Sequence, residues 1–366
     1  MKMILEIQEG DKVHLPKNLH ETHNTCAIVY DLISEFIIND NYEFLKNTNF
    51  KFEEHHIKID ELKNNSITGL EWLKENNLTD QIEIVLTKKI LIGVLGDLLN
   101  FVFESLHCAK RGKMTVAYSL IRKPISDSLL ILEELLTDRK NFIKNFHFDG
   151  DINKYDPSRR NLDKFKIIES AINKLGFKAL FDANYIHELR YDKKSPIGLN
   201  SMSNQAIHIV TKDKNYQTEK GELNFVFSSK ENQEYYYNHY YTLVTYLLIY
   251  SSSIIDELTF SLTDNIDHHN IFIIKEFKRL IALLLFGENQ NQSKLPNENS
   301  SLVFNEISSN VIIECEHCKT KNIISKPDCI LLFKSNLLLC SNCFVDLKKT
   351  SINSVIEKIN LLRAKK

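Results

Sequence analysis

The sequence predicts a mainly α-helical protein with a large helical domain and a small cysteine-containing C-terminal module. Three observations predict this. Only 10 glycines and 6 prolines occur in 366 residues, which favours long helices over many tight turns. Apolar residues recur at steps of three and four over long stretches. Four cysteines form two Cys-x-x-Cys pairs near the end of the chain.

Capping patterns locate the first helices. Thr68 with Glu71 matches a capping box, in which each residue satisfies a backbone N–H of the other. Asp80 is suited to cap a longer helix, whose apolar positions run from Ile82 to Phe103. That helix is apolar on two faces, so we expect it to lie centrally.

Prolines mark the next elements. Pro124 falls inside a helix predicted over 113–136 and must kink or split it, because proline removes a backbone donor. Asp156 with Pro157 predicts the start of a helix that Gly176 ends. The segment "ALFDANYIHELR" predicts another helix.

The pattern changes between about 204 and 228. "AIHIVT" and "NFVF" are short, β-like segments on either side of a polar loop, which predicts a small β-hairpin insertion. Helical spacing then returns in one apolar stripe. The stripe comprises Tyr236, Tyr240, Leu243, Leu247, Tyr250 and Ile254.

A polar segment, "GENQNQSKLPNENSS", predicts a linker at 287–302. It divides a helical domain (1–286) from a cysteine module (303–350) and a basic C-terminal helix (351–366). We expect few contacts to cross the linker, so that the helical domain folds alone.

Charge and apolar runs limit the class of protein. The formal net charge of −2 gives no global basic field for nucleic acid. The two most apolar stretches, from Ile90 and Thr242, are shorter than the roughly 18 residues of a membrane span. No signal peptide is evident, so we expect a cytoplasmic protein without a membrane partner, in a compartment where paired cysteines bind metal.

The cysteine pairs predict a metal site formed by Cys315, Cys318, Cys340 and Cys343. Two such pairs supply the tetrahedral thiolate shell that Zn²⁺ prefers. With the β-like segments "SNVIIE", "NIIS" and "CILLFK", this region resembles a zinc ribbon. That resemblance implies a structural Zn²⁺, since four protein ligands leave no position for water. Incidental cysteines or a redox dithiol are the alternatives.

Polar residues in the helical domain offer a second candidate site. His107 and Arg122 flank one polar stretch, and "YIHELRYD" adds His187 and Arg190. These four residues are the catalytic candidates if they converge in space. The alternative is that they are solvated helix ends and hydrogen-bonded core groups.

The helices "AYSLIRKPISDSLLILEELL" and "YTLVTYLLIYSSSIIDEL" resemble HEPN-like families of bacterial abortive-infection and toxin proteins. The resemblance implies a helical fold and a role in defence against phage. The ribonucleases of that superfamily carry an arginine four to six residues before a histidine. No arginine of this chain has that spacing; Arg139 and His147 come nearest.

The last 64 residues are locally basic. From Val303 to Lys366 the chain has ten Lys or Arg and six Asp or Glu, hence +4 here and −6 elsewhere. The terminal helix has a basic face suited to phosphates, or it is an ordinary solvated helix. We therefore expect a non-enzymatic binding or effector protein that recognises nucleic acid or protein through this module. The alternative is a nuclease-like toxin that uses the polar site of the helical domain.

Overall fold

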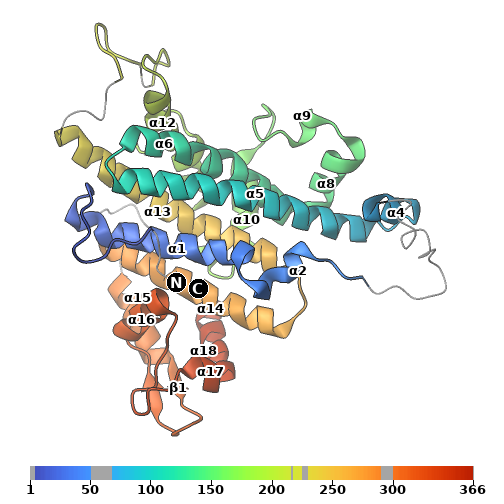
Figure 1. Cartoon of the computed structure of the whole chain (residues 1–366), viewed down its shortest axis with the longest axis vertical. Helices are drawn as coiled ribbons and strands as arrows, with labels where there is room; N and C mark the ends of the chain where they lie inside the picture. Colours follow the sequence, from blue (N-terminus) through green and yellow to red (C-terminus); the bar gives the residue numbers. More distant parts are fainter. Residues whose placement is uncertain (1–4, 51–67, 216, 225–229, 290–299, 366) are drawn as a thin grey trace.

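The structure is a computed structural model, and it describes residues 5–50, 68–215, 217–224, 230–289 and 300–365. Four long helices lie side by side and form the body of the molecule (Figure 1). They are α1 (His20–Ile38), α5 (Thr79–Lys110), α13 (Lys230–Phe260) and α14 (Ile266–Asn289). The prediction of a mainly α protein is confirmed.

Shorter helices pack around these four. They are α2 (Glu43–Lys46), α4 (Gly69–Glu75), α6 (Met114–Lys123), α7 (Leu129–Thr137), α8 (Arg139–Ile143), α9 (Ile152–Tyr155), α10 (Lys164–Ile172), α11 (Ala183–Tyr191) and α12 (Leu199–Ile207). Three 3₁₀ turns cover Lys17–Leu19, Asp40–Tyr42 and Lys178–Leu180, and π-helical turns cover Pro124–Ser128 and Lys144–Asp149.

Local signals predicted two of these features. Thr68 and Glu71 form the expected capping box at the start of α4. Pro124 begins a π-helical turn between α6 and α7, so the predicted helix is split there. This wider π-helical turn accommodates the interruption that Pro124 causes in the hydrogen bonds of the helix.

Other predicted helix boundaries were wrong. The long helix α5 begins at Thr79, before the expected cap Asp80. The Asp156 side chain does not cap a helix; it accepts hydrogen bonds from Ser158 N–H and Oγ and closes a turn. Helix α10 is capped instead by Asp163 and ends at Ile172, four residues before Gly176.

The hairpin predicted at about 204–228 is not formed in the part of it that the structure describes. Residues up to Ile207 continue α12, and the described residues of 208–224 contain no strand. Two backbone hydrogen bonds join the two sides of this segment, Thr218 N–H to the Thr211 carbonyl at 3.0 Å and Asn224 N–H to the Ile209 carbonyl at 2.8 Å. Side chains add to them, because Thr218 Oγ1 accepts from Thr211 N–H and Asn224 Nδ2 donates to the His208 carbonyl. "NFVF" lies largely outside the described residues.

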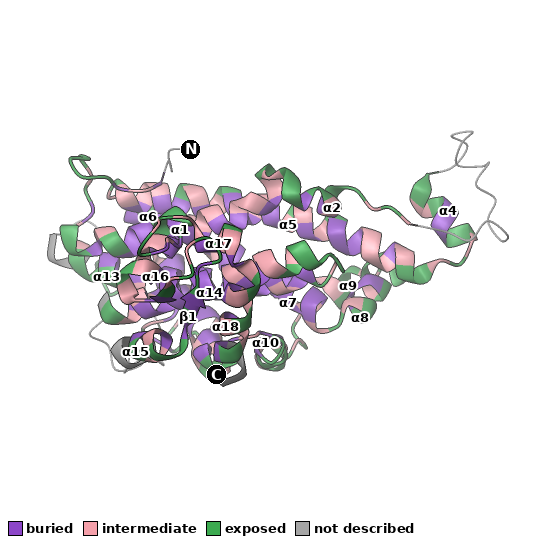
Figure 2. Cartoon of the chain, turned by 90° about the horizontal axis from the view of Figure 1, so that it is seen from below, coloured by how far each residue is buried: buried purple, intermediate pink, exposed green. Residues whose placement is uncertain are grey.

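The predicted apolar stripe of α13 is confirmed, because each of its six residues is at most 8% exposed. Helix α13 packs on α1, α7 and α14 at the centre of the body, and Figure 2 shows buried positions concentrated along these inner helices. By length and composition it could cross a membrane, but 94% of its most apolar window is buried inside the protein. It is the core helix of the fold.

An ion pair lies inside this core. Arg190 of α11 and Glu133 of α7 are both fully buried, and Arg190 Nη1 donates to Glu133 Oε1 at 2.5 Å. Arg190 Nε also donates to the Ile125 carbonyl at 2.9 Å, and Tyr250 Oη donates to Glu133 Oε1 at 2.7 Å. The network joins α7, α11, α13 and the π-helical turn.

The C-terminal module begins at α15 (Ser300–Asn310) and continues with β1 (Ile312–Glu314), β2 (Lys321–Ile323), α16 (Lys326–Ser335), α17 (Leu347–Thr350) and α18 (Ile352–Lys365). Of the predicted linker 287–302, the first three residues continue α14 and the last three belong to α15. Positions 290–299 lie outside the described residues.

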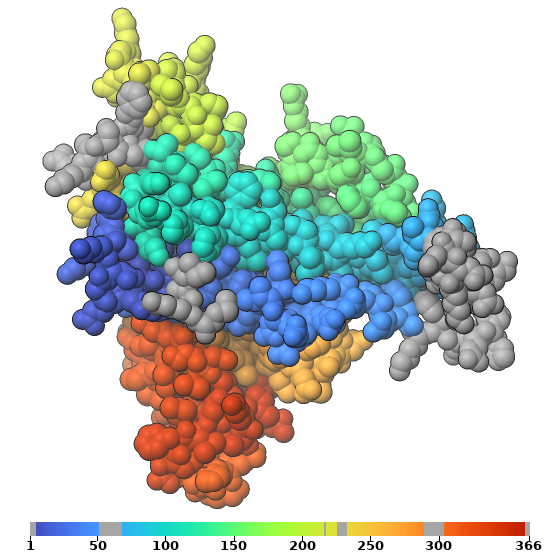
Figure 3. Space-filling model, viewed as in Figure 1, coloured from blue at the N-terminus to red at the C-terminus, as the bar shows by residue number. Residues whose placement is uncertain are grey.

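The module packs directly on the body. Helices α15, α16 and α18 contact α14, and one continuous apolar core includes residues of both parts. Two ion pairs add to this contact, Lys326–Glu288 at 2.7 Å and Lys334–Glu21 at 2.9 Å. Figure 3 shows the module seated beneath α1 and α14. The expectation that few contacts join the two parts is therefore wrong.

We predict that Arg190→Met lowers the free energy of unfolding by about 3–5 kcal/mol, because it leaves the Glu133 carboxylate buried without its cation. Urea unfolding followed by circular dichroism measures this change. The double variant Arg190→Met/Glu133→Leu should recover most of the loss, since it removes both charges. A double variant as unstable as the single one would contradict this explanation.

Candidate metal centre

The four cysteines lie on two loops of the C-terminal module. Cys315 and Cys318 are on the turn between β1 and β2, which pair antiparallel with Ile313 opposite Asn322. Cys340 and Cys343 are on a second turn, closed by an isolated bridge between Leu339 and Asp346. Each pair is thus held by strand-like hydrogen bonds on both sides.

The two loops have the same backbone geometry. In each loop, the N–H of the first cysteine donates to the carbonyl of the residue five positions later. The N–H of the residue four positions later donates to the carbonyl of that same cysteine. The bonds are Cys315 N to Thr320 O (2.9 Å), Lys319 N to Cys315 O (2.7 Å), Cys340 N to Val345 O (2.9 Å) and Phe344 N to Cys340 O (3.0 Å). Lys319 and Phe344 both have left-handed backbones, with φ of 61° and 58°. We call these loops the first and second knuckle.

The geometry of the four sulfurs fits a tetrahedral ion. The Cys315 and Cys343 Sγ atoms lie 3.7 Å apart, and those of Cys318 and Cys340 lie 3.5 Å apart. All four lie within 4.8 Å of one another, and none is in a disulfide. Zinc–sulfur bonds of about 2.3 Å give a tetrahedron with edges of roughly 3.8 Å. The structure thus brings together the four cysteines that the spacing predicted.

The pKa values of the cysteine thiols also favour a bound cation. The hydroxyl and backbone N–H of Thr320 lower the pKa of Cys318 to about 5. The Cys343 thiol receives a backbone hydrogen bond from Val345, yet desolvation and the neighbouring thiols raise its pKa to about 12. Four thiolates at this spacing repel one another, so a divalent cation is needed to hold them all deprotonated.

Two polar residues that the sequence analysis did not identify support the site. Asn322, 4% exposed, accepts from the N–H and Oγ of Ser341 and donates to the Ile313 carbonyl. Its side chain thereby joins the second knuckle to β1. Fully buried Ser351 donates to the Glu314 carbonyl at 3.0 Å and accepts from Glu316 N–H at 3.2 Å.

One predicted strand of the module is a helix. "CILLFK" belongs to α16, which begins with Pro327 in its first turn and a capping box of Ser325 and Asp328. These start signals outweigh the β-like composition of the segment. Cys329 is buried on this helix and His317 is exposed, and neither belongs to the sulfur cluster. The module is therefore compatible with a zinc-ribbon-like arrangement that carries a helix between its knuckles.

The four catalytic candidates of the body do not contact one another directly, although Arg190 and His187 both contact Tyr191. Arg190 is the buried partner of Glu133, and Arg122 Nη1 donates to Asn204 Oδ1 at 3.0 Å. His107 stacks on Phe103, at 6.1 Å between ring centroids.

His187, the fourth candidate, lies beside Tyr191, with ring centroids 5.7 Å apart. Burial lowers the pKa of His187, and likewise that of His107. In the part of the chain that the structure describes, no hydrogen bond or ion pair joins any two of the four candidates.

Comparison with known proteins found no counterpart. No protein-family model matches the chain. No curated protein and no solved structure is significantly similar to it. The resemblance to HEPN-like families is therefore not supported by any relative.

We predict that the purified protein contains about one zinc ion per chain, because the four sulfurs have the separations of a closed thiolate shell. Elemental analysis by plasma mass spectrometry measures the content. Cys340→Ser should lower it strongly, whereas Cys329→Ser, outside the cluster, should leave it unchanged. Equal metal content in all three proteins would rule out the site.

We predict that Asn322→Ala destabilises the module by about 2 kcal/mol and speeds metal release to a chelator, since Ser341 N–H and the Ile313 carbonyl lose their partner. Release to a chromogenic chelator measures the rate. Asn342→Ala is the matched control, because Asn342 is exposed on the same knuckle. Equal release rates for the two variants would contradict the proposed support.

Proposed function

We propose that this protein is a non-enzymatic binding or effector protein that recognises a macromolecule through its C-terminal module. In this proposal the bound ion is Zn²⁺, and its role is structural. Four thiolate ligands close the coordination shell, so the ion fixes the two knuckles rather than activating water. What the module offers a partner is then the surface that the knuckles hold in place.

The observation that carries the proposal is the position of Phe344. It is 72% exposed, more than any other large apolar side chain of the described residues. Its backbone is left-handed, with φ of 58°, a conformation that glycine adopts without cost and a phenylalanine does not. An exposed aromatic ring held in a strained backbone beside Cys343 suggests a contact residue.

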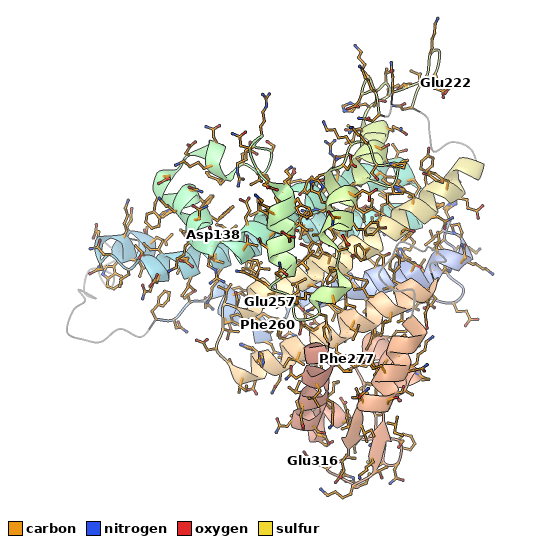
Figure 4. The ribbon with its side chains drawn as sticks, turned by 180° about the vertical axis from the view of Figure 1, so that it is seen from behind. Asp138, Glu222, Glu257, Phe260, Phe277 and Glu316 are labelled. Atoms are coloured by element: carbon orange, nitrogen blue, oxygen red, sulfur yellow. The ribbon has the colours of Figure 1, made fainter. Side chains whose placement is uncertain are left out.

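The surroundings of the knuckles suit a binding surface. Ile312 and Ile323 face each other across β1 and β2 and are 42% and 61% exposed. Lys319 and Lys321, on the first knuckle and β2, are also exposed. Glu316, on the first knuckle, lies at the end of the module farthest from the helical body, where a large partner has room (Figure 4).

Several basic side chains of the module form ion pairs within the protein. Lys326 and Lys334 pair with carboxylates of the body, and Lys348 pairs with Asp346 at 2.9 Å. Lys349 is exposed. On α18 the apolar face is buried, as Val355 and Ile359 show, so this face is a packing surface. The side chains of Arg363, Lys365 and Lys366 lie outside the described residues.

The competing proposal, a nuclease-like toxin, has less support. It needs His107, Arg122, His187 and Arg190 to act together, whereas Arg190 is fully buried in its ion pair with Glu133. A role in bacterial defence against phage, implied by the HEPN-like resemblance, stays a prediction.

We predict that Phe344→Ala weakens binding at least tenfold, by removing the ring on which a base or an apolar side chain would rest. Fluorescence anisotropy with labelled single-stranded RNA and DNA at low salt tests the nucleic-acid case. Replacing Lys319, Lys321 and Lys349 with Gln should reduce the salt slope by about 2, given about 0.7 per phosphate on a single strand.

Binding of a protein partner is tested by crosslinking and mass spectrometry with the wild-type protein and Phe344→Ala. Phe148→Ala is the control, because Phe148 is an exposed phenylalanine of the body. No binding of RNA or DNA, together with identical crosslinked proteins for the two variants, would refute the proposed function.

A further inference from the structure

The outer edges of the β1–β2 hairpin can be identified from its hydrogen bonds. Cys315 N–H donates to the Thr320 carbonyl at 2.9 Å, and Ile324 N–H donates to the Val311 carbonyl at 3.1 Å. These bonds lie at the two ends of the hairpin, so the residues that they join are hydrogen-bonded pairs of the antiparallel ladder. Such pairs alternate with non-hydrogen-bonded pairs, whose backbone N–H and C=O groups point outward, away from the partner strand.

The outer edge of β1 is already covered. By this alternation it carries the backbone groups of Ile312 and Glu314. Ser351, at the start of α18, donates through Oγ to the Glu314 carbonyl at 3.0 Å, and α18 packs on β1. This edge of the hairpin therefore faces the module's own C-terminal helix.

The outer edge of β2 has no such partner. It carries the backbone groups of Lys321 and Ile323, and among the described residues no hydrogen bond reaches their outward N–H and C=O groups. Both side chains are exposed, that of Ile323 to 61%. The hairpin lies at the end of the module away from the body (Figure 1). This edge thus offers N–H donors and carbonyl acceptors in the alternating order with which another strand pairs.

We propose that the outer edge of β2 binds an extended segment of a partner protein as a third strand of the sheet. This inference rests on the proposed function and specifies the macromolecule as a polypeptide. An extended peptide presents N–H and C=O groups in the same alternation and at the same spacing, so each outward group of β2 gains a partner. A nucleic acid presents no such ladder of donors and acceptors.

Side chains beside this edge indicate the sequence of the partner strand. Lys319, Lys321 and Ile323 are all exposed. The ion pairs of the module are formed by other lysines, namely Lys326, Lys334 and Lys348. Opposed side chains of neighbouring strands interact, so the partner strand places Asp or Glu near Lys321 and an apolar residue beside Ile323. A second copy of β2 is disfavoured as the occupant, because it would bring the lysines of two chains to one edge.

Panning a displayed library of short random peptides against the full chain tests the proposal. Ile323→Pro removes an outward N–H that makes no ladder bond, so the hairpin should persist. Ile323→Val keeps this N–H and is the matched control. Peptides enriched on the wild-type protein should carry apolar residues in alternation with Asp or Glu. By fluorescence anisotropy they should bind Ile323→Val like wild type and Ile323→Pro about tenfold more weakly, the equivalent of one hydrogen bond.

Methylation of the peptide backbone tests the pairing on the wild-type protein, whether or not Ile323→Pro folds. N-methyl groups should weaken binding at every second position of an enriched peptide, since only alternate N–H groups of an added strand face β2. Equal weakening at all positions, or equal binding to wild type and folded Ile323→Pro, would overturn the proposal. So would a dimer of the protein, seen by sedimentation, that Ile323→Pro dissociates. Binding of RNA or DNA without any enriched peptide would overturn this inference and leave the proposed function standing.

Discussion

The structure depends on the burial of α14 on both of its sides. One side packs on α1 and α13, and the other supports α15, α16 and α18. Four consecutive or near-consecutive charged residues of this helix, Lys275, Glu276, Lys278 and Arg279, are each at most 6% exposed. Charged side chains on a helix enclosed in this way need partners inside the protein. Lys275 accordingly pairs with Glu35, and Arg279 pairs with Asp256.

The metal centre extends this constraint into the module. Two turns as short as the knuckles have little apolar surface of their own, so a few polar contacts fix them, and their four cysteines could hold a metal ion. Asn322 links the knuckles to each other, and Ser351 links the first knuckle to the start of α18. Since α18 packs on α14, Ser351 and α18 connect the first knuckle to the body.

The outer and inner ends of the module differ in the surfaces that they present. Its outer end presents Phe344 and the Ile312–Ile323 pair on a frame fixed by the knuckles. Its inner end packs on α14 through α15, α16 and α18.

The sequence by itself determined the features whose physical cause is local. Two-residue spacing places the sulfurs of each knuckle, the pairing of Thr68 with Glu71 starts α4, and Pro124 interrupts its helix because one residue lacks a donor. Periodicity likewise predicted the buried stripe of α13. Tertiary structure decided the rest. The burial of Arg190, the docking of the module on α14 and the roles of Asn322 and Ser351 depend on partners distant in sequence. Local composition carries no information about such partners. It also misassigned "CILLFK" and the described part of 204–228 as strands; at "CILLFK" the capping box and Pro327 outweigh the β-like composition.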